Sequence, residues 1–384
     1  MKVALINKVF SLGYGGSERY GVNLARTLCQ KGIEVHLFGA LVEDVSSEAI
    51  VHRVNTPKRP AFRRITKFIT NTRPLVNSQD FDIVYSITQY YPAHVFRIGG
   101  GVYKHWMNLR FPGIVPRLLR YLLNPVHIAH LHLESSMYRP ENYKAIIANS
   151  NLCKGHAISY YSVPGDRIEV IHNGVDQSTF NLEIRDPYRK SQRKVLGISN
   201  DNIGILFVSN NWQRKGMDTI LQALHLLGKD ARYFKIIGVG KGKKRRFMMR
   251  AKELGIDSQV CFIEPTREIE RYYAAADIFI LPTQYDPFSN ACIEAMACGL
   301  PVITTASNGA SEVITHKKTG FVLDKNDNAK TLAFYLTCLI DNEPREAMGL
   351  KAAESVLDLT LEQNMEETLK VFNKIMKKGD LMHG

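Results

Sequence analysis

Short apolar segments alternate with amphipathic helical patterns along most of this 384-residue chain, and no other feature constrains its fold as much. Parallel strands joined by helices arise from such an alternation through right-handed crossover connections. The strands expected in the first half are Val3–Ile6, Glu34–Phe38, Asp82–Ser86 and Ala145–Ala148. A second run comprises Ile203–Val208, Phe234–Ile237, Gln259–Ile263, Asp277–Leu281 and Pro301–Thr304. The pattern predicts an α/β protein with two Rossmann-like domains in tandem.

The length also favours two domains, because a single core seldom serves this many residues. The expected helices are Ser17–Lys31, Gly216–Leu227, Lys243–Leu254, Arg267–Ala275 and Asn290–Cys298. We place the domains at residues 1–172 and 173–360. Residues 361–384 form a C-terminal segment whose amphipathic helix is expected to pack back on the N-terminal domain.

Composition excludes several classes of protein. The apolar fraction of 45% is that of a globular chain, and no stretch approaches the ~20 apolar residues of a membrane span. The first residues are too weakly apolar for a secretory signal, which predicts a cytoplasmic protein. The six cysteines are scattered without metal-ligand spacing, so we expect neither a zinc site nor a disulfide.

The net charge of +13 implies an acidic partner, which could be nucleic acid, an anionic membrane or a phosphorylated substrate. Between residues 51 and 133 the only acids are Asp80 and Asp82, against twelve Lys and Arg. Aromatic residues alternate with these cations: Phe62, Phe68, Tyr103, Trp106, Phe111 and Tyr121. The segment is either a solvated basic face or a surface that associates peripherally with the inner face of an anionic membrane; we favour the second. A nucleic-acid-binding protein is an alternative, although no RNA-binding motif or recognition-helix pattern is visible.

The first loop, LGYGGSER, contains Gly15 and Gly16 directly before a helix start. Glycines there let the backbone approach an anion, and the free N–H groups of the helix point at it. A tight turn without a ligand is the simpler interpretation. A nicotinamide site is disfavoured because the end of the second strand, HLFGA, has no acid for a ribose.

The second candidate is FVSNNWQRKG, which ends a strand and begins a helix with Arg214 and Lys215. Cations are unfavourable at the positive end of a helix dipole, so these two indicate a compensating anion such as a diphosphate. Random surface basicity is the alternative.

The third candidate is YDPFSNACIEAMACGLPVI, an apolar helix with one carboxylate, Glu294. If amides near Ser289–Cys292 hold a phosphate, Glu294 can accept hydrogen bonds from a ribose diol, because helical side chains lean toward the N-terminus. Asp286 would face the sugar beyond the phosphates. Alternatively, Asp286 is a turn residue and Glu294 a satisfied buried acid.

Together these motifs resemble glycosyltransferase family 4, the retaining enzymes that use nucleotide sugars. The resemblance includes GGSER, Ala148-Asn-Ser150, the hinge His172-Asn-Gly-Val-Asp176, NNWQRKG, and DPFSNACIEAMACGLPVITT followed by Asn308-Gly-Ala-Ser-Glu312. It implies a GT-B fold, with two Rossmann-like domains facing each other across a cleft. Phe96-Arg-Ile-Gly-Gly-Gly-Val-Tyr103 and Asn124-Pro-Val-His127 are most similar to the lipopolysaccharide-core glucosyltransferase branch.

The resemblance implies a transfer of a hexose from a nucleotide-diphosphate sugar, expected to be a UDP-sugar, to a lipopolysaccharide-core or other lipid-linked glycan. Lys215 and Arg214 would neutralise the donor diphosphate, and Glu294 would bind the ribose. The other donor residues implied are Gly15, Gly16, the amides of Phe288, Ser289, Asn290 and Ala291, and Asp286 for the sugar. The chain departs from the family at Asp286, where Glu is common, and at Asn210, where Arg is frequent.

The expected chemistry stabilises the leaving diphosphate with cations and helix-terminus amides. No DxD motif in strand context is found, so we expect no divalent metal and no cofactor. No carboxylate nucleophile is identified, and the resemblance implies a front-face reaction in which the donor phosphate accepts the acceptor proton. Glu18 and His94 are candidates for contact with the sugar or acceptor, as is Tyr103, although each fits a structural role as well. A nucleotide-sugar epimerase of the same fold is the alternative enzyme. The sequence predicts no oligomeric state.

Overall fold

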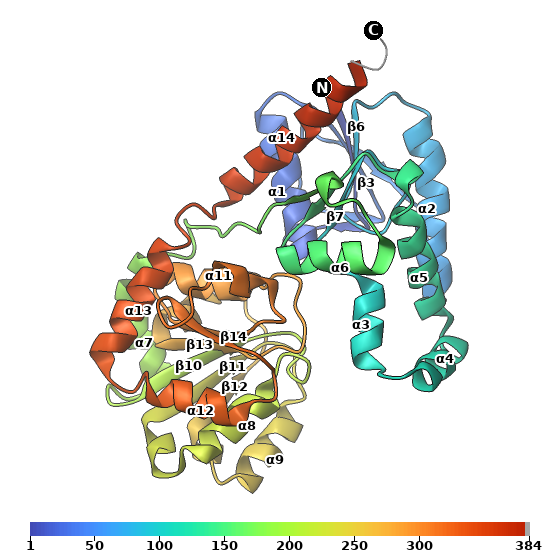
Figure 1. Cartoon of the computed structure of the whole chain (residues 1–384). Coiled ribbons are helices and arrows are strands. Elements are labelled where there is room, and N and C mark those ends of the chain that lie inside the picture. The colour runs from blue at the N-terminus through green and yellow to red at the C-terminus, as the bar shows by residue number, and fades with distance from the viewer. Residues whose placement is uncertain (381–384) are drawn as a thin grey trace. The chain divides into compact units, whose positions relative to one another are not determined.

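The structure is a computed structural model that describes residues 1–380. The chain divides into two compact units, one formed by residues 1–172 with the segment that starts at Leu361, the other by Asn173–Thr360 (Figure 1). The last four residues of the expected C-terminal segment, 381–384, lie outside the described residues.

The N-terminal unit is built on a seven-stranded sheet whose strand order is β5-β3-β1-β6-β7-β8-β9, and its paired strands are parallel. Its strands are β1 (Lys2–Ile6), β3 (Glu34–Gly39), β5 (Ile50–Arg53), β6 (Ile83–Ser86), β7 (Val95–Ile98), β8 (Ala145–Ala148) and β9 (Ile168–Val170). A small parallel pair, β2 (Val9–Phe10) and β4 (Leu41–Val42), lies outside the sheet. The helices are α1 (Gly16–Gln30), α2 (Ala61–Asn77), α3 (Tyr103–Arg110), α4 (Ile114–Leu123), α5 (Pro125–Met137) and α6 (Asn151–Tyr161).

The C-terminal helix α14 (Leu361–Asp380) belongs to the N-terminal unit, where it lies beside α1 (Figure 1). Its side chains Met365, Phe372 and Ile375 are buried in the same core as β1. The hydroxyls of Tyr20 and Thr368 lie 3.3 Å apart, and Phe372 makes an edge contact with Tyr85. The apolar stripe of α14 thus completes a core that the first 172 residues leave open.

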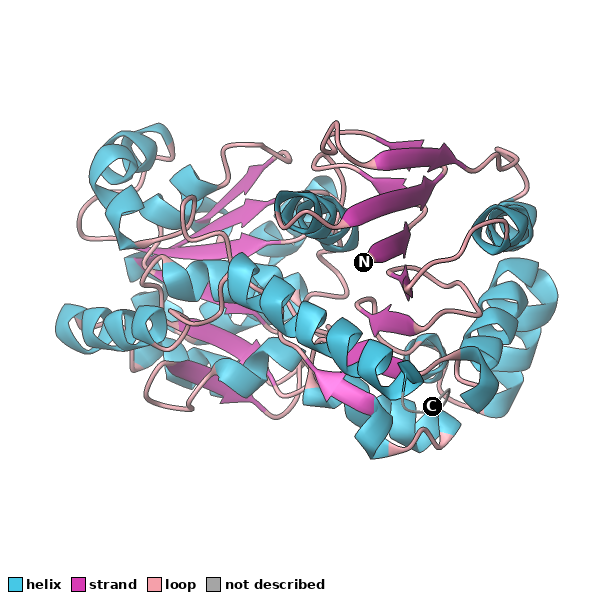
Figure 2. Ribbon diagram, turned by 90° about the horizontal axis from the view of Figure 1, so that it is seen from above, coloured by secondary structure: helices cyan, strands magenta, loops and turns pink. Residues whose placement is uncertain are grey.

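The C-terminal unit contains a six-stranded parallel sheet of order β12-β11-β10-β13-β14-β15. Its strands are β10 (Ile203–Val208), β11 (Phe234–Val239), β12 (Val260–Ile263), β13 (Ile278–Leu281), β14 (Val302–Thr305) and β15 (Gly320–Leu323). The helices are α7 (Arg185–Val195), α8 (Met217–Leu226), α9 (Lys244–Glu253), α10 (Glu270–Ala275), α11 (Asn290–Ala297), α12 (Ala329–Thr337) and α13 (Asn342–Glu354). In each unit the strands run between helices (Figure 2), and the prediction of two Rossmann-like domains is confirmed.

The sequence predicts that Asp277 begins a strand, but β13 starts one residue later, and the side chain of Asp277 anchors α7. Its buried carboxylate accepts hydrogen bonds from Arg189 (2.5 Å), from Arg193 (2.8 Å) and from the amide of Gly204 (2.7 Å). Burial alone would raise the pKa of Asp277, but the two guanidinium groups and the amide hold it below its usual value. The cluster fixes α7 against the amino ends of β10 and β13, so it lies at the edge of the sheet away from the candidate site.

Candidate functional site

Lys215 and Asp286 form a buried ion pair at the carboxyl edge of the second sheet. Lys215 follows β10 and Asp286 follows β13, two adjacent strands, and the Lys215 ammonium donates to Asp286 Oδ2. The two residues are only 8% and 9% exposed. The sequence predicts an anion opposite Lys215, and in the structure the protein itself supplies one. Ligands of open parallel sheets bind at this edge.

Backbone contacts between the two loops bring this pair together. Gly216 has φ +89°, and a Cβ at this position would lie 2.1 Å from the carbonyl oxygen of Pro282. The amide of Gln284 donates to the carbonyl of Arg214 over 3.0 Å. The loops after β10 and β13 can approach this closely only because residue 216 is a glycine.

The local electrostatics make Lys215 sensitive to added negative charge. Burial, together with the neighbouring Arg214, lowers the pKa of Lys215 to about 7. Arg214 is half-buried, and burial lowers the pKa of its guanidinium too. A phosphate placed beside these groups would favour their charged forms, so the geometry suits a ligand that brings its own negative charge.

Asn210 has a bracing role in this structure. Its side-chain oxygen accepts a hydrogen bond from the amide of Lys241 over 3.2 Å, which ties the loop after β10 to the loop after β11. Asn210 carries no charge, so the cations of the loop after β10 are Arg214 and Lys215.

The loop that precedes α11 is held by Asn308, a residue that carries no predicted role in the sequence. Asn308 Oδ1 accepts from the amides of Ser289 (3.2 Å) and Ala310 (3.1 Å), and the amide of Gly309 donates to the carbonyl of Asp286 (2.9 Å). The Ser289 amide, expected to hold a phosphate, is therefore occupied by the protein. Asn290 and Ala291 begin α11, and amides of a first turn have no partner within their helix.

The side chains of Phe288 and Asn290, at the start of α11, make contacts within the same unit. Phe288 is buried in the core, and Asn290 Oδ1 accepts a hydrogen bond from Asn173 over 2.7 Å. Ser289 occupies the N-cap position, but its side chain makes no capping hydrogen bond.

Glu294 is half-buried in the second turn of α11 and is held by Tyr273 of α10. The Tyr273 hydroxyl donates to Glu294 Oε2 over 2.8 Å. Burial and the nearby carboxylate raise the pKa of Tyr273 far above its usual value, so this phenol stays a donor. Cys292, two residues before Glu294, accepts a hydrogen bond from the Asn308 side chain. The ribose contact of Glu294 stays a prediction, and the hydrogen bond from Tyr273 helps to orient its carboxylate.

In the N-terminal unit, the glycine loop leads into α1 as expected. Gly15 and Gly16 are exposed, and Glu18 folds back so that a Cβ on Gly15 would lie 2.9 Å from its carboxylate. An acid in the first turn is favourable against the helix dipole. Asp44, with φ +59°, shapes the loop by accepting from the Ser11 hydroxyl and the Leu12 amide, a contact that the sequence did not predict.

His94 does not fit the expected contact with the sugar or acceptor. It directly precedes β7, at the amino edge of the sheet, whereas the glycine loop follows β1 and lies toward the carboxyl edge. Its Nδ1 accepts a hydrogen bond from the amide of Val84 over 3.2 Å. The structural alternative therefore describes His94.

Tyr103 begins α3, and a buried carboxylate that the sequence did not mark fixes this end of the helix. Glu134 accepts from the amides of Tyr103 (2.5 Å) and Lys104 (2.9 Å) and from the Tyr161 hydroxyl (2.7 Å). The Tyr103 hydroxyl itself hydrogen-bonds to His127. Tyr103 is thus held at both ends, with its phenol half-buried.

Lys8 is a buried cation that the sequence analysis did not assign to a site. It lies two residues after the end of β1, and burial, with a further effect from Arg64, lowers its pKa to about 8. Burial, with a further effect from Lys8, also lowers the pKa of His130, whose ring lies beside Gln89 and Tyr103. Lys8 had no glycine or proline signal around it, so only the fold reveals that it lies near these groups.

Two negative findings apply to residues 1–380. In this part of the chain no three His, Cys, Asp or Glu side chains are grouped as a metal ion would require. No helix there has both the length and the apolar composition needed to cross a bilayer.

Two Rossmann-like units in one chain are the architecture of GT-B proteins. In this chain, cations and helix-start amides lie at the carboxyl edge of the second sheet. The crystal structure of WaaG, a glycosyltransferase involved in lipopolysaccharide biosynthesis, matches with a TM-score of 0.83 at 20% identity, over 96% of this chain and 99% of that chain. The Anabaena protein Alr3699/HepE in complex with UDP-glucose matches with a TM-score of 0.72 at 16% identity, over 97% and 100% of the two chains. At these identities the likeness shows the fold.

The family follows from the sequence comparisons. The family model "Glycosyltransferase Family 4" matches residues 14–179, and "Glycosyl transferases group 1" matches residues 188–355. The chain therefore belongs to the family 4 glycosyltransferases, as the resemblance indicated. A glycosyltransferase of Methanocaldococcus jannaschii, MJ1607, is 27% identical over 188 residues, 48% of each chain. The chain spans about half the length of this curated relative.

Proposed function

We propose that this protein transfers a hexose, with retention of configuration, from a UDP-sugar to a glycan acceptor of the lipopolysaccharide core or another lipid-linked cell-surface glycan. The observation that carries the proposal is the buried Lys215–Asp286 pair beside the start of α11, at the carboxyl edge of the second sheet. The presence of UDP-glucose in the HepE complex supports the donor. The involvement of WaaG in lipopolysaccharide biosynthesis supports the acceptor class.

In this proposal each group of the second unit contacts one part of the donor. Lys215 and Arg214, with the first-turn amides of Asn290 and Ala291, bind the diphosphate, because cations and helix N-termini favour anions. Glu294, oriented by Tyr273, accepts hydrogen bonds from the ribose diol.

Asp286 contacts the sugar hydroxyls and holds the ammonium of Lys215 in place. In the first unit, the exposed backbone of Gly15 and Gly16 is suited to an anion, and Glu18 and Tyr103 are the candidates of this unit for contact with the acceptor or the sugar.

Transfer follows from charge stabilisation at the leaving group. As the bond from the anomeric carbon to the phosphate oxygen breaks, negative charge grows on the diphosphate, and the fixed ammonium and amides stabilise it. The acceptor hydroxyl attacks from the same face, and its proton passes to the departing phosphate oxygen. A carboxylate nucleophile is not needed, which agrees with the engagement of Asp286 by Lys215.

The test is a calorimetric titration with UDP and with UMP. Lys215→Met should weaken UDP binding about tenfold or more, the loss expected for a charged hydrogen bond, and should affect UMP less. Glu294→Ala should weaken both nucleotides by about 1–3 kcal/mol, since the ribose is common to them. Lys252→Met, which removes an exposed cation of α9, is the matched control. Failure of the wild type to bind any nucleoside diphosphate would contradict the proposal.

A sugar-nucleotide epimerase of the same fold predicts a different product. Incubation with the donor alone should leave its sugar configuration unchanged if the protein is a transferase. Conversion of the donor without acceptor would favour the epimerase.

We also propose that α4 docks on the anionic inner face of the cytoplasmic membrane. Its large apolar side chains point to solvent: Ile114, Val115, Leu118, Leu119 and Leu123 are each more than half exposed. Arg117 and Arg120 lie on the same helix, and Arg110 precedes it. Apolar side chains flanked by cations are typical of helices that lie in a membrane interface. Phe68, which was expected on this surface, is instead buried in the core.

Sedimentation with vesicles tests the docking. The protein should pellet with phosphatidylglycerol vesicles more than with phosphatidylcholine vesicles, and Leu123→Ser should reduce pelleting. Equal pelleting with both lipids would indicate an ordinary solvated basic face.

A further inference from the structure

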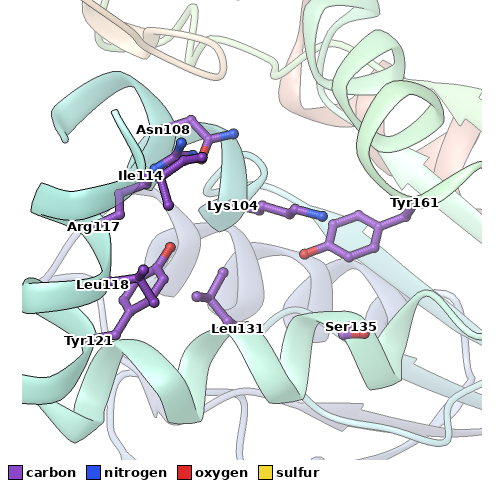
Figure 3. Close-up of a pocket in the computed structure, with 9 residues that line it drawn as sticks. All are labelled: Lys104, Asn108, Ile114, Arg117, Leu118, Tyr121, Leu131, Ser135 and Tyr161. Carbon is purple, nitrogen blue, oxygen red and sulfur yellow. The ribbon is translucent and has the colours of Figure 1, made fainter. Parts of the chain in front are cut away.

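The N-terminal unit contains a cavity of about 420 Å³ that the proposed donor site does not use. It lies among α3, α4, α5 and the end of α6 (Figure 3). One wall is apolar and is formed by Ile114, Leu118 and Leu131, whereas Lys104, Arg117 and Tyr161 supply polar groups. The cavity is therefore amphipathic.

The polar part of the cavity carries positive charge. Lys104 is exposed, and its ammonium lies 5.4 Å from the centre of the Tyr161 ring, toward which it points in Figure 3. Arg117 is fixed by hydrogen bonds to the Asn108 side chain and the Gly113 carbonyl. The acid of this region, Glu134, is buried and accepts from two amides and the Tyr161 hydroxyl.

The apolar wall continues onto the exposed surface of α4. Ile114 and Leu118 line the cavity and are also 70% and 54% exposed, respectively. A molecule in the cavity would contact these side chains at the helix that we propose to lie in the membrane interface. The proposed membrane docking of α4 would bring the ligand to this cavity. The lining residues, however, determine which ligand fits, whether or not α4 docks.

We propose that this cavity binds one anionic lipid, with its headgroup phosphate at Lys104 and Arg117 and an acyl chain along Ile114, Leu118 and Leu131. A phosphate matches the two cations, and a hydrocarbon chain matches the three apolar side chains, beside which the Tyr121 ring also lies (Figure 3). A sugar ring fits less well along Ile114, Leu118 and Leu131, because these three side chains offer its hydroxyls no partner.

The experiment titrates the full-length protein with monomeric dihexanoylphosphatidylglycerol below its micelle concentration. Leu118→Ala should weaken binding at least fivefold, and Lys104→Gln should do the same. The matched controls are Leu119→Ala, because Leu119 is 55% exposed on the same helix but does not line the cavity, and Lys67→Gln, which removes an exposed cation of α2. Each control should change binding less than twofold, with unaltered thermal melting for all four variants.

The ligand arms identify what the cavity recognises. Glycerol phosphate, which is the headgroup without chains, and dihexanoylphosphatidylcholine should each bind at least tenfold more weakly. Equal affinity for glycerol phosphate would show a simple phosphate site and overturn the lipid proposal, as would equal effects of Leu118→Ala and Leu119→Ala. Pelleting with anionic vesicles without binding of the monomeric lipid would overturn the cavity proposal but not the docking. Monomer binding without pelleting would contradict the docking alone.

Discussion

Replacing Asp286 by Asn would remove the carboxylate that faces the Lys215 ammonium. Both side chains are buried, so the ammonium would lose its charged partner where water cannot replace it. Breaking a buried pair in this way costs about 3–5 kcal/mol. The lowered pKa of Lys215 limits the loss, because the amine can lose its proton near neutral pH instead of staying charged.

Urea unfolding of Asp286→Asn, Lys215→Met and the double variant would measure this coupling. Each single variant should lose about 3 kcal/mol or more, and the double variant should lose clearly less than the sum. Asp218→Asn is the control, because its pair with Arg246 is far more exposed than that of Lys215 with Asp286 and should contribute less than about 1 kcal/mol. UDP should stabilise Asp286→Asn more than the wild type, since the diphosphate replaces the missing negative charge. Additive losses, or single losses no larger than that of the control, would refute the reasoning.

Three further outcomes are expected. Gly216→Ala should destabilise the protein by more than about 1 kcal/mol and weaken UDP binding in calorimetry, because its Cβ would collide with the carbonyl of Pro282. Tyr273→Phe should weaken UDP binding by about 0.5–1.5 kcal/mol through Glu294 while leaving the thermal melt nearly unchanged. Asp277→Asn should be destabilised at pH 7, and the difference from the wild type in acid-titrated unfolding should shrink as the pH falls below 4. The folded-state pKa of Asp277 is depressed, so its stabilisation is present above the ordinary pKa of 3.8 and is lost on acidification.

The sequence was sufficient for the two-domain architecture because buried parallel strands are continuous apolar runs with helical patterns between them. The carboxyl ends of such strands meet at one edge, so Lys215 and Asp286 could be assigned to one site although 71 positions separate them. β7 was not predicted, since its buried Arg97 interrupts the apolar pattern and stacks on Tyr20 in the fold.

The supporting contacts of the site were harder to predict. Asn308 accepts a hydrogen bond from the Ser289 amide although β14 lies between the two residues in the sequence. The sequence gives no sign that a polar loop residue makes so distant a contact. Glu134 caps α3 from another helix, so no local capping motif marks it. His94 could be named only as a candidate, because the sequence does not show its position at the amino edge of the sheet.

The central claim is that Lys215 binds the diphosphate of a nucleotide sugar at the start of α11. A crystal structure of the protein with UDP tests this most directly. The account predicts a phosphate oxygen within about 3 Å of Lys215 Nζ, with the ribose hydroxyls at Glu294. UDP bound elsewhere, with Lys215 still paired only to Asp286, would contradict it.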